Sequence, residues 1–159
     1  MKKFIQNKLK DQKGLTLIEL LAVIVILAII AAIAIPAIGN VIENSRVGTA
    51  KSDYINAIAA AELYLLDNPN GGTGAVVGST TQKEIQLTDL LGTSGTTESY
   101  LDDQGSLTAF DYDPTAKTFS GSATQGSVTL EADAGTTKEN ITDLKNSDET
   151  ATGTLTLTR

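Results

Sequence analysis

The feature that most constrains this chain is an uncharged apolar stretch near its N-terminus, from Leu20 to Ile38. No Asp, Glu, Lys or Arg interrupts it, and as an α-helix it is roughly 28 Å long, close to the ~30 Å hydrocarbon core of a bilayer. A helix that is apolar on all sides has to lie in lipid or be covered by protein. We therefore expect a membrane-embedded or protein-covered helix, followed by a separate polar part.

The residues before the apolar stretch are basic and end in a small residue. Residues 1–14 contain five lysines and one aspartate, and Gly14 is the last of them. An ordinary secretory signal has its small-residue cleavage site after the apolar centre, whereas Gly14 precedes it. The lysines predict that this end faces the cytoplasm. Glu19 lies at the edge of the apolar stretch, where a carboxylate without a partner is costly.

These features resemble the prepilin motif of type IV pilins and their pseudopilin relatives. The matching residues are Lys13, Gly14, Thr16, Leu17, Glu19, Leu20, Leu21 and Pro36. The resemblance implies that a prepilin peptidase cuts after Gly14 and that Leu15, where the family usually has Phe, is then N-methylated. It also implies that Leu15, Thr16 and Glu19 act in assembly, with Glu19 pairing with the α-amine of a neighbouring subunit. The alternative is a helix-start carboxylate, stabilised only by the helix dipole.

The chain is expected to contain four segments. They are a leader peptide (1–14), an apolar transmembrane or filament-core helix (15–42), its amphipathic continuation (43–68) and a β-rich globular part (69–159). Pro36 and Gly39 predict a kink in the helix, because proline removes a backbone donor. Pro69 and the two glycines after Asn70 should end the helix near Leu66.

The amphipathic segment has one apolar stripe with helical spacing. Its residues are Val47, Ala50, Tyr54, Ile58, Ala61 and Leu65. Packing against the chain's own globular part explains this stripe without a partner, and a coiled-coil oligomer is the alternative.

The globular part alternates apolar and polar residues in short runs. Strands are expected over 107–112, 118–122, 127–132 and 154–158, while 84–91 is either a helix or a strand, and 136–149 is a loop with a helical turn over 139–144. The expected inward pairs are Leu107 with Ala109, Val128 with Leu130, and Leu155 with Leu157. The predicted fold class is α+β: a long N-terminal helix packed on a small antiparallel sheet, the pilin fold.

Composition narrows the possible functions. Without its leader the chain has 7 basic and 18 acidic side chains, a net charge of −11, which argues against sequence-independent nucleic-acid binding. The chain contains no Cys and no His, so no disulfide, thiolate metal site or histidine base is expected. Many Gram-negative pilins close a C-terminal loop with a disulfide, so the absence of Cys favours a Gram-positive source.

Three other patterns have a functional and a plain interpretation. The glycine-rich segment 71–78 lacks the strand before it and the Lys-Ser/Thr after it that a phosphate loop needs, so a flexible loop is expected. Clustered aspartates can bind Ca²⁺, but the EF-hand spacing is absent and such loop acids are usually solvated. Asn140-Ile141-Thr142 is a glycosylation sequon, a pattern that often occurs by chance. The aspartates considered for Ca²⁺ are Asp102, Asp103, Asp111 and Asp113.

No Ser, Lys or carboxylate pair has a recognisable base beside it, so no enzymatic activity is expected, and no cofactor or metal is expected either. The resemblance implies a structural subunit of a type IV pilus, stored as a single-pass membrane protein and polymerised through its helix into a surface filament for adhesion, motility or DNA uptake. The implied partners are identical subunits, the prepilin peptidase, an assembly ATPase, a platform membrane protein and, before assembly, membrane lipid. One alternative is a pseudopilin of a type II secretion or competence system. Another is a membrane-anchored surface binding domain, which leaves Gly14 and Glu19 unexplained.

Overall fold

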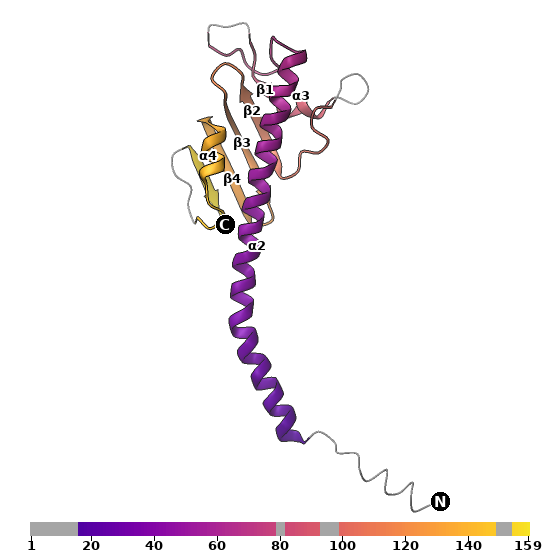
Figure 1. Cartoon of the computed structure of the whole chain (residues 1–159), viewed down its shortest axis with the longest axis vertical. Helices are drawn as coiled ribbons and strands as arrows, with labels where there is room; N and C mark the ends of the chain where they lie inside the picture. Colours follow the sequence, from indigo (N-terminus) through magenta and orange to yellow (C-terminus); the bar gives the residue numbers. More distant parts are fainter. Residues whose placement is uncertain (1–15, 79–81, 93–98, 149–153) are drawn as a thin grey trace, which may run out of the picture. The chain divides into compact units, whose positions relative to one another are not determined.

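The computed structural model describes residues 16–78, 82–92, 99–148 and 154–159. Contacts divide the chain into two compact units between Asn40 and Val41, and each unit is described by itself. The elements in chain order are α2 (Leu17–Asp67), β1 (Ile85–Gln86), α3 (Leu87–Leu91), β2 (Leu107–Asp113), β3 (Thr118–Gln125), β4 (Val128–Thr136), α4 (Lys138–Asp143) and β5 (Leu155–Thr158) (Figure 1). The fold is the predicted α+β type, a long helix whose second part packs on an antiparallel sheet.

Helix α2 is 51 residues long and continues through Pro36 and Gly39. It ends at Asp67, where Pro69 disfavours helical backbone in the residue before it, as the sequence predicts. A Cβ atom on Gly39 would meet nothing within 4 Å, so no contact within the described residues requires a glycine there. The kink at Pro36 and Gly39 therefore stays a prediction.

The sheet is a five-stranded antiparallel meander in the order β1-β2-β3-β4-β5. All four expected strands are present, and β3 and β4 are longer than predicted. The segment 84–91, for which helix and strand were both open, is divided between β1 and α3. The prediction of a loop over 136–149 is wrong at its first residue, because Thr136 belongs to β4. The helical turn expected within this loop is present as α4.

The predicted inward orientation is wrong for one residue of β2. Leu107 is buried as expected, but Ala109 is exposed and Phe110 and Tyr112 face the core instead. The register against β3 shifts between Leu107 and Ala109, a β-bulge that inserts one extra residue. A shift of one residue moves the following side chains to the opposite face. The inward pairs of β4 and β5 are buried as predicted.

The core of the unit from Val41 to Arg159 lies between the predicted stripe of α2 and one face of the sheet. Tyr54 is at its centre, with its ring 5.3 Å from that of Phe119 and its hydroxyl donating to the Leu130 carbonyl (3.2 Å). The stripe is buried as predicted except at its end, where Tyr64 replaces Leu65 in the core and Leu65 is half-buried. The stripe thus packs on the chain's own sheet, so it does not need a coiled-coil partner.

Burial raises the pKa of Tyr54, and Glu131 adds to this shift; burial likewise raises the pKa values of Tyr64 and Tyr112. An unfolded chain therefore loses its tyrosine protons first as pH rises past about 10, while the folded chain keeps them. This contribution to stability is complete below that pH and is lost as pH rises through the folded pKa values. We expect a fragment beginning at Val41 to unfold at a lower urea concentration at pH 11 than at pH 9. Tyr54→Phe should make this loss smaller, and an unchanged loss in Tyr54→Phe would contradict the assignment.

The glycine-rich segment 71–78 is packed over its first half, rather than being the flexible loop that was expected. The Gly74 amide donates to the Glu84 carbonyl (3.0 Å), and a Cβ atom on Gly74 would lie 2.8 Å from that oxygen. The buried Asp89 carboxylate also holds this segment, because it accepts hydrogen bonds from the Thr73 amide (2.9 Å) and hydroxyl (2.8 Å). The glycines here therefore allow a close backbone approach.

Candidate functional site

The first part of α2 is an apolar helix with its side chains uncovered. Among the described residues, α2 is the one helix long and apolar enough to cross a membrane, by length and composition. Large apolar side chains from Leu17 to Ile42 are exposed, for example Leu17 at 84% and Ile33 at 71%. Such a surface needs lipid or other protein around it.

Thr16 and Glu19 form a reciprocal cap at the start of α2. The Glu19 carboxylate oxygen Oε2 accepts hydrogen bonds from the Thr16 amide (2.7 Å) and the Thr16 hydroxyl (2.8 Å). The Glu19 amide in turn donates to the Thr16 hydroxyl oxygen (3.2 Å). This is the capping-box arrangement, which satisfies amides that have no partner within the helix.

The cap uses only one oxygen of the Glu19 carboxylate. Both donors from Thr16 reach Oε2, and Oε1 has no hydrogen-bond partner among the residues that the structure describes. Thr16 therefore turns the carboxylate toward the helix start while one oxygen remains available. A cation brought close to this helix start would find a carboxylate already positioned for it.

The structure brings Thr16 and Glu19 together, but Gly14 and Leu15 lie outside the described residues. The resemblance predicted assembly roles for Thr16 and Glu19, and the alternative was a helix-start carboxylate at Glu19 without Thr16 as its partner. The signal for their pairing was present as Thr16-Leu17-Ile18-Glu19, which fits the pattern Ser/Thr-x-x-Glu before an apolar run.

The aspartates considered for Ca²⁺ mostly stabilise local structure. Asp113 accepts from the amides of Thr115 (2.7 Å) and Ala116 (2.9 Å) in the β2–β3 turn. Asp103 accepts from the Gly105 amide (3.2 Å) and Asp111 from the Gln86 side chain (3.1 Å). In the described ranges, no group of three or more His, Cys, Asp or Glu is placed to hold a metal ion.

The sequon residue Asn140 is exposed in the first turn of α4 and has a structural role. Its side-chain oxygen accepts from the amide and the hydroxyl of Thr137, both at 2.8 Å. This second capping box explains the presence of Asn140 without a glycan.

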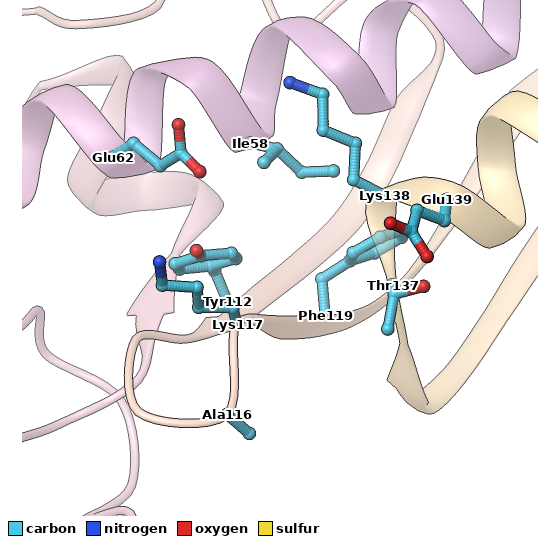
Figure 2. Close-up of a pocket in the computed structure, with 9 residues that line it drawn as sticks. All are labelled: Ile58, Glu62, Tyr112, Ala116, Lys117, Phe119, Thr137, Lys138 and Glu139. Carbon is cyan, nitrogen blue, oxygen red and sulfur yellow. The ribbon is translucent and has the colours of Figure 1, made fainter.

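An open groove of about 300 Å³ lies beside α2, between it and the β2–β3 turn (Figure 2). Tyr112 and Phe119 contribute aromatic rings to its lining. Its charged side chains are of both signs, and none has an ion-pair partner among the described residues: Glu62, Lys117, Lys138 and Glu139. This mixture favours no one class of charged ligand.

Comparison with known proteins finds a match to the family model described as the prokaryotic N-terminal methylation motif, over residues 9–35. The match includes Lys10 and Lys13 before Gly14, the Thr16–Glu19 cap and most of the apolar stretch. No curated protein and no solved structure matches the chain. None of these comparisons supports the expected Gram-positive source.

The motif and the fold agree with each other. The methylation motif lies on the apolar start of a long helix, and the later part of that helix packs on an antiparallel sheet. The chain therefore has the N-methylation motif of the type IV pilin and pseudopilin family together with a pilin-like α+β fold.

Proposed function

We propose that the chain is a structural subunit of a type IV pilus, held in the membrane by α2 and then polymerised into a surface filament. Members of this family are structural proteins, and the methylation motif implies processing by a prepilin peptidase. The observation that carries the proposal is the capped start of α2 beside an exposed apolar helix, where one Glu19 carboxylate oxygen has no partner among the described residues. In a helix that serves only as an anchor, Glu19 would act through the cap alone.

In this proposal the leader, residues 1–14, stays on the cytoplasmic side and is removed. Cleavage after Gly14 makes Leu15 the new N-terminus, with an α-amine of pKa about 7.7–8.0 that is mostly cationic at neutral pH and is then methylated. The cut creates a cation at the residue directly before Thr16 and four residues before Glu19, whose carboxylate Thr16 positions. Processing thereby supplies the charge that Glu19 can bind.

Assembly then transfers the apolar helix from lipid to the filament core. Both surroundings are apolar, so the transfer itself changes the free energy little, and an assembly ATPase acting through a platform membrane protein supplies direction. The Leu15 amine and Glu19 would be costly in this core as single charges, whereas pairing between neighbouring subunits offsets that cost. The pair would also set the axial position of one helix against the next.

Replacing Gly14 with valine tests the processing step. A side chain at this position should prevent the peptidase from binding the chain, so Gly14→Val should accumulate as full-length precursor in the membrane. Mass spectrometry of the N-terminal peptide should find methyl-Leu15 in the wild type and Met1 in the variant, with Gly14→Ala as the mildest control. Normal maturation of Gly14→Val would reject cleavage at this site.

Electron microscopy of cells that express the wild-type chain tests the filament itself. Long surface filaments containing the mature chain are expected. Filaments that remain short and do not extend from the surface would instead assign the chain to the pseudopilins. An uncleaved wild-type chain without filaments would reject both and leave a membrane-anchored surface domain.

A further inference from the structure

Basic side chains gather at the end of the second unit that follows the apolar stretch in the chain. We call this end the base and define it by the first turns of α2 in the unit and the residues that contact them. They are residues 43–51 of α2, 126–127 in the β3–β4 turn, 144–148 after α4, and Arg159. Figure 1 shows the C-terminus beside α2 at this end of the sheet.

The charge of the base is opposite to that of the rest of the protein. The base has four basic and two acidic side chains, whereas the rest of the chain after the leader has three basic and 16 acidic ones. A local positive charge in a strongly acidic protein attracts anions to one place on its surface. The base is therefore the part of the unit that suits an anionic partner.

Arg46 is held in place by the β3–β4 turn. Its Nη1 donates to the Ser127 hydroxyl (2.9 Å), and a Cβ atom on Gly126 would lie 2.7 Å from its guanidinium carbon. Gly126 also has a φ of +64°, which favours glycine. The guanidinium therefore lies against a turn whose glycine leaves room for it.

Arg159, the other arginine of the chain, stabilises the base itself. Its Nη2 donates to the carbonyls of Asn146 (2.6 Å) and Asp148 (2.7 Å), and its Nη1 donates to the Asn44 side chain (3.0 Å). Glu43 lies 3.7 Å away and balances its charge. Arg159 thus joins the start of the unit's helix to the loop after α4.

The charges of Arg46 and Lys145 are not balanced in this way. Among the described residues neither side chain has an ion-pair partner, and the one hydrogen bond of the Arg46 guanidinium goes to a neutral hydroxyl. Lys145 is exposed, and Arg46 is half-buried with further N–H donors. These two side chains are the ones that a ligand at the base can use.

The position of Arg46 in the chain fits the depth of lipid headgroups. Arg46 comes eight residues after Ile38, which is about 12 Å of α-helix, and the headgroup layer adds about 5–8 Å beyond the hydrocarbon on each side. Side chains of a helix are tilted toward its N-terminus, and a long arginine side chain reaches several Å in that direction. A guanidinium at this position can therefore reach the phosphate groups of a membrane that contains the apolar stretch.

We propose that Arg46 and Lys145 bind the phosphate groups of anionic phospholipids on the outer side of the membrane, an inference that rests on the proposed storage of the chain in the membrane. A guanidinium can donate two parallel hydrogen bonds to one phosphate, and a lysine adds a point charge beside it. The contact holds the acidic unit at an anionic surface that would otherwise repel it. It is lost on assembly, because the filament carries the base away from lipid.

Solid-state NMR of the full-length chain in bilayers tests this contact. The guanidinium carbon of arginine is labelled with ¹³C, and its dipolar coupling to lipid ³¹P is measured in phosphatidylglycerol bilayers in phosphate-free buffer. The leader contains lysines but no arginine, so the label reports on the base alone. A guanidinium that donates to a phosphate should give a carbon–phosphorus distance of roughly 4–5 Å. A wild-type chain without this coupling would overturn the inference.

Two variants that keep the charge assign the coupling to one residue. Arg159→Lys removes the label at position 159 and should keep the coupling, whereas Arg46→Lys should lose it. An unchanged circular dichroism spectrum checks that Arg46→Lys remains folded. Coupling that persists in Arg46→Lys would place the lipid at Arg159 and overturn the assignment.

Paired charge removals give a second measurement, on a chain that begins at Leu15 and so lacks the leader lysines. Electron paramagnetic resonance of spin-labelled phosphatidylglycerol and phosphatidylcholine gives the preference of the chain for the anionic lipid. Arg46→Gln with Lys145→Gln should reduce this preference about fivefold or more, since each basic side chain near an anionic lipid surface raises binding about fivefold.

The matched control is Lys83→Gln with Lys117→Gln, which removes the same charge from exposed positions outside the base. It should keep the lipid preference, and equal losses in the two double variants would overturn the inference. Neither measurement needs filaments. Absence of filaments in cells would therefore reject the proposed pilus function and leave the lipid contact standing, whereas a chain that does not insert into bilayers would reject membrane storage and this inference with it.

Discussion

Glu19→Ala should reduce surface filaments at least about tenfold while membrane insertion and cleavage after Gly14 remain normal. In the proposed assembly, the substitution leaves the Leu15 amine without its carboxylate in an apolar filament core, and removing one partner of a buried charge pair costs about 2–5 kcal/mol. Insertion depends on the apolar stretch after Glu19, which is unchanged. The measurement is a filament count in a strain whose only copy is the variant, with mature chain confirmed in the membrane.

Glu19→Gln is the control that separates the two roles of this residue. A glutamine oxygen can still accept from the Thr16 amide and hydroxyl, so the helix cap is kept, but it cannot neutralise a cation. If pairing with the amine drives assembly, Glu19→Gln should lose filaments as Glu19→Ala does. Normal filaments in Glu19→Gln would show that Glu19 acts only through the cap.

Ile58→Asp should destabilise the unit from Val41 to Arg159 by several kcal/mol. Ile58 is 2% exposed, in the stripe that faces the sheet, and an aspartate there would be a buried charge without a partner. Urea unfolding of a fragment beginning at Val41, followed by circular dichroism, measures the loss.

The matched control for Ile58→Asp is Leu66→Asp, on the same helix. Leu66 is 76% exposed, so an aspartate at this position keeps its water and should change the stability of the fragment by less than about 0.5 kcal/mol. Equal effects of the two substitutions would show that the stripe does not form the core.

Sequence periodicity predicted the parts of the fold that depend on one repeated spacing. The stripe from Val47 to Ile58 and the strand pairs of β4 and β5 follow from helical and alternating patterns, which do not depend on distant residues. Ala109 was misplaced because its orientation depends on a bulge against β3, a tertiary feature without a local pattern. Leu65 was misplaced because the aromatic ring of Tyr64 packs against Tyr100, more than 30 residues away.

The candidate site was predicted by residue type rather than by geometry. The resemblance to the prepilin motif predicted roles for Gly14, Leu15 and Glu19, and the matching family model covers the same stretch; these roles stay predictions. Spacing could not show that Thr16 donates both of its hydrogen bonds to one oxygen of the Glu19 carboxylate. This geometry depends on the side-chain conformations of both residues. The hydrogen bonds of Arg46 to Ser127 and of Asp53 to Ser106 could not be predicted either, because each pair is separated by more than 50 residues in the chain.

The order of the strands has a consequence for how the protein folds outside the membrane. Each strand from β1 to β5 pairs with its neighbour in the chain, and the turns of the two hairpins from β2 to β4 are short. Closing short loops costs little entropy, and proteins rich in such local pairs fold quickly. In the proposed membrane topology, we therefore expect the hairpins to form while later residues are still crossing the membrane, so the buried stripe of α2 is covered soon after it emerges.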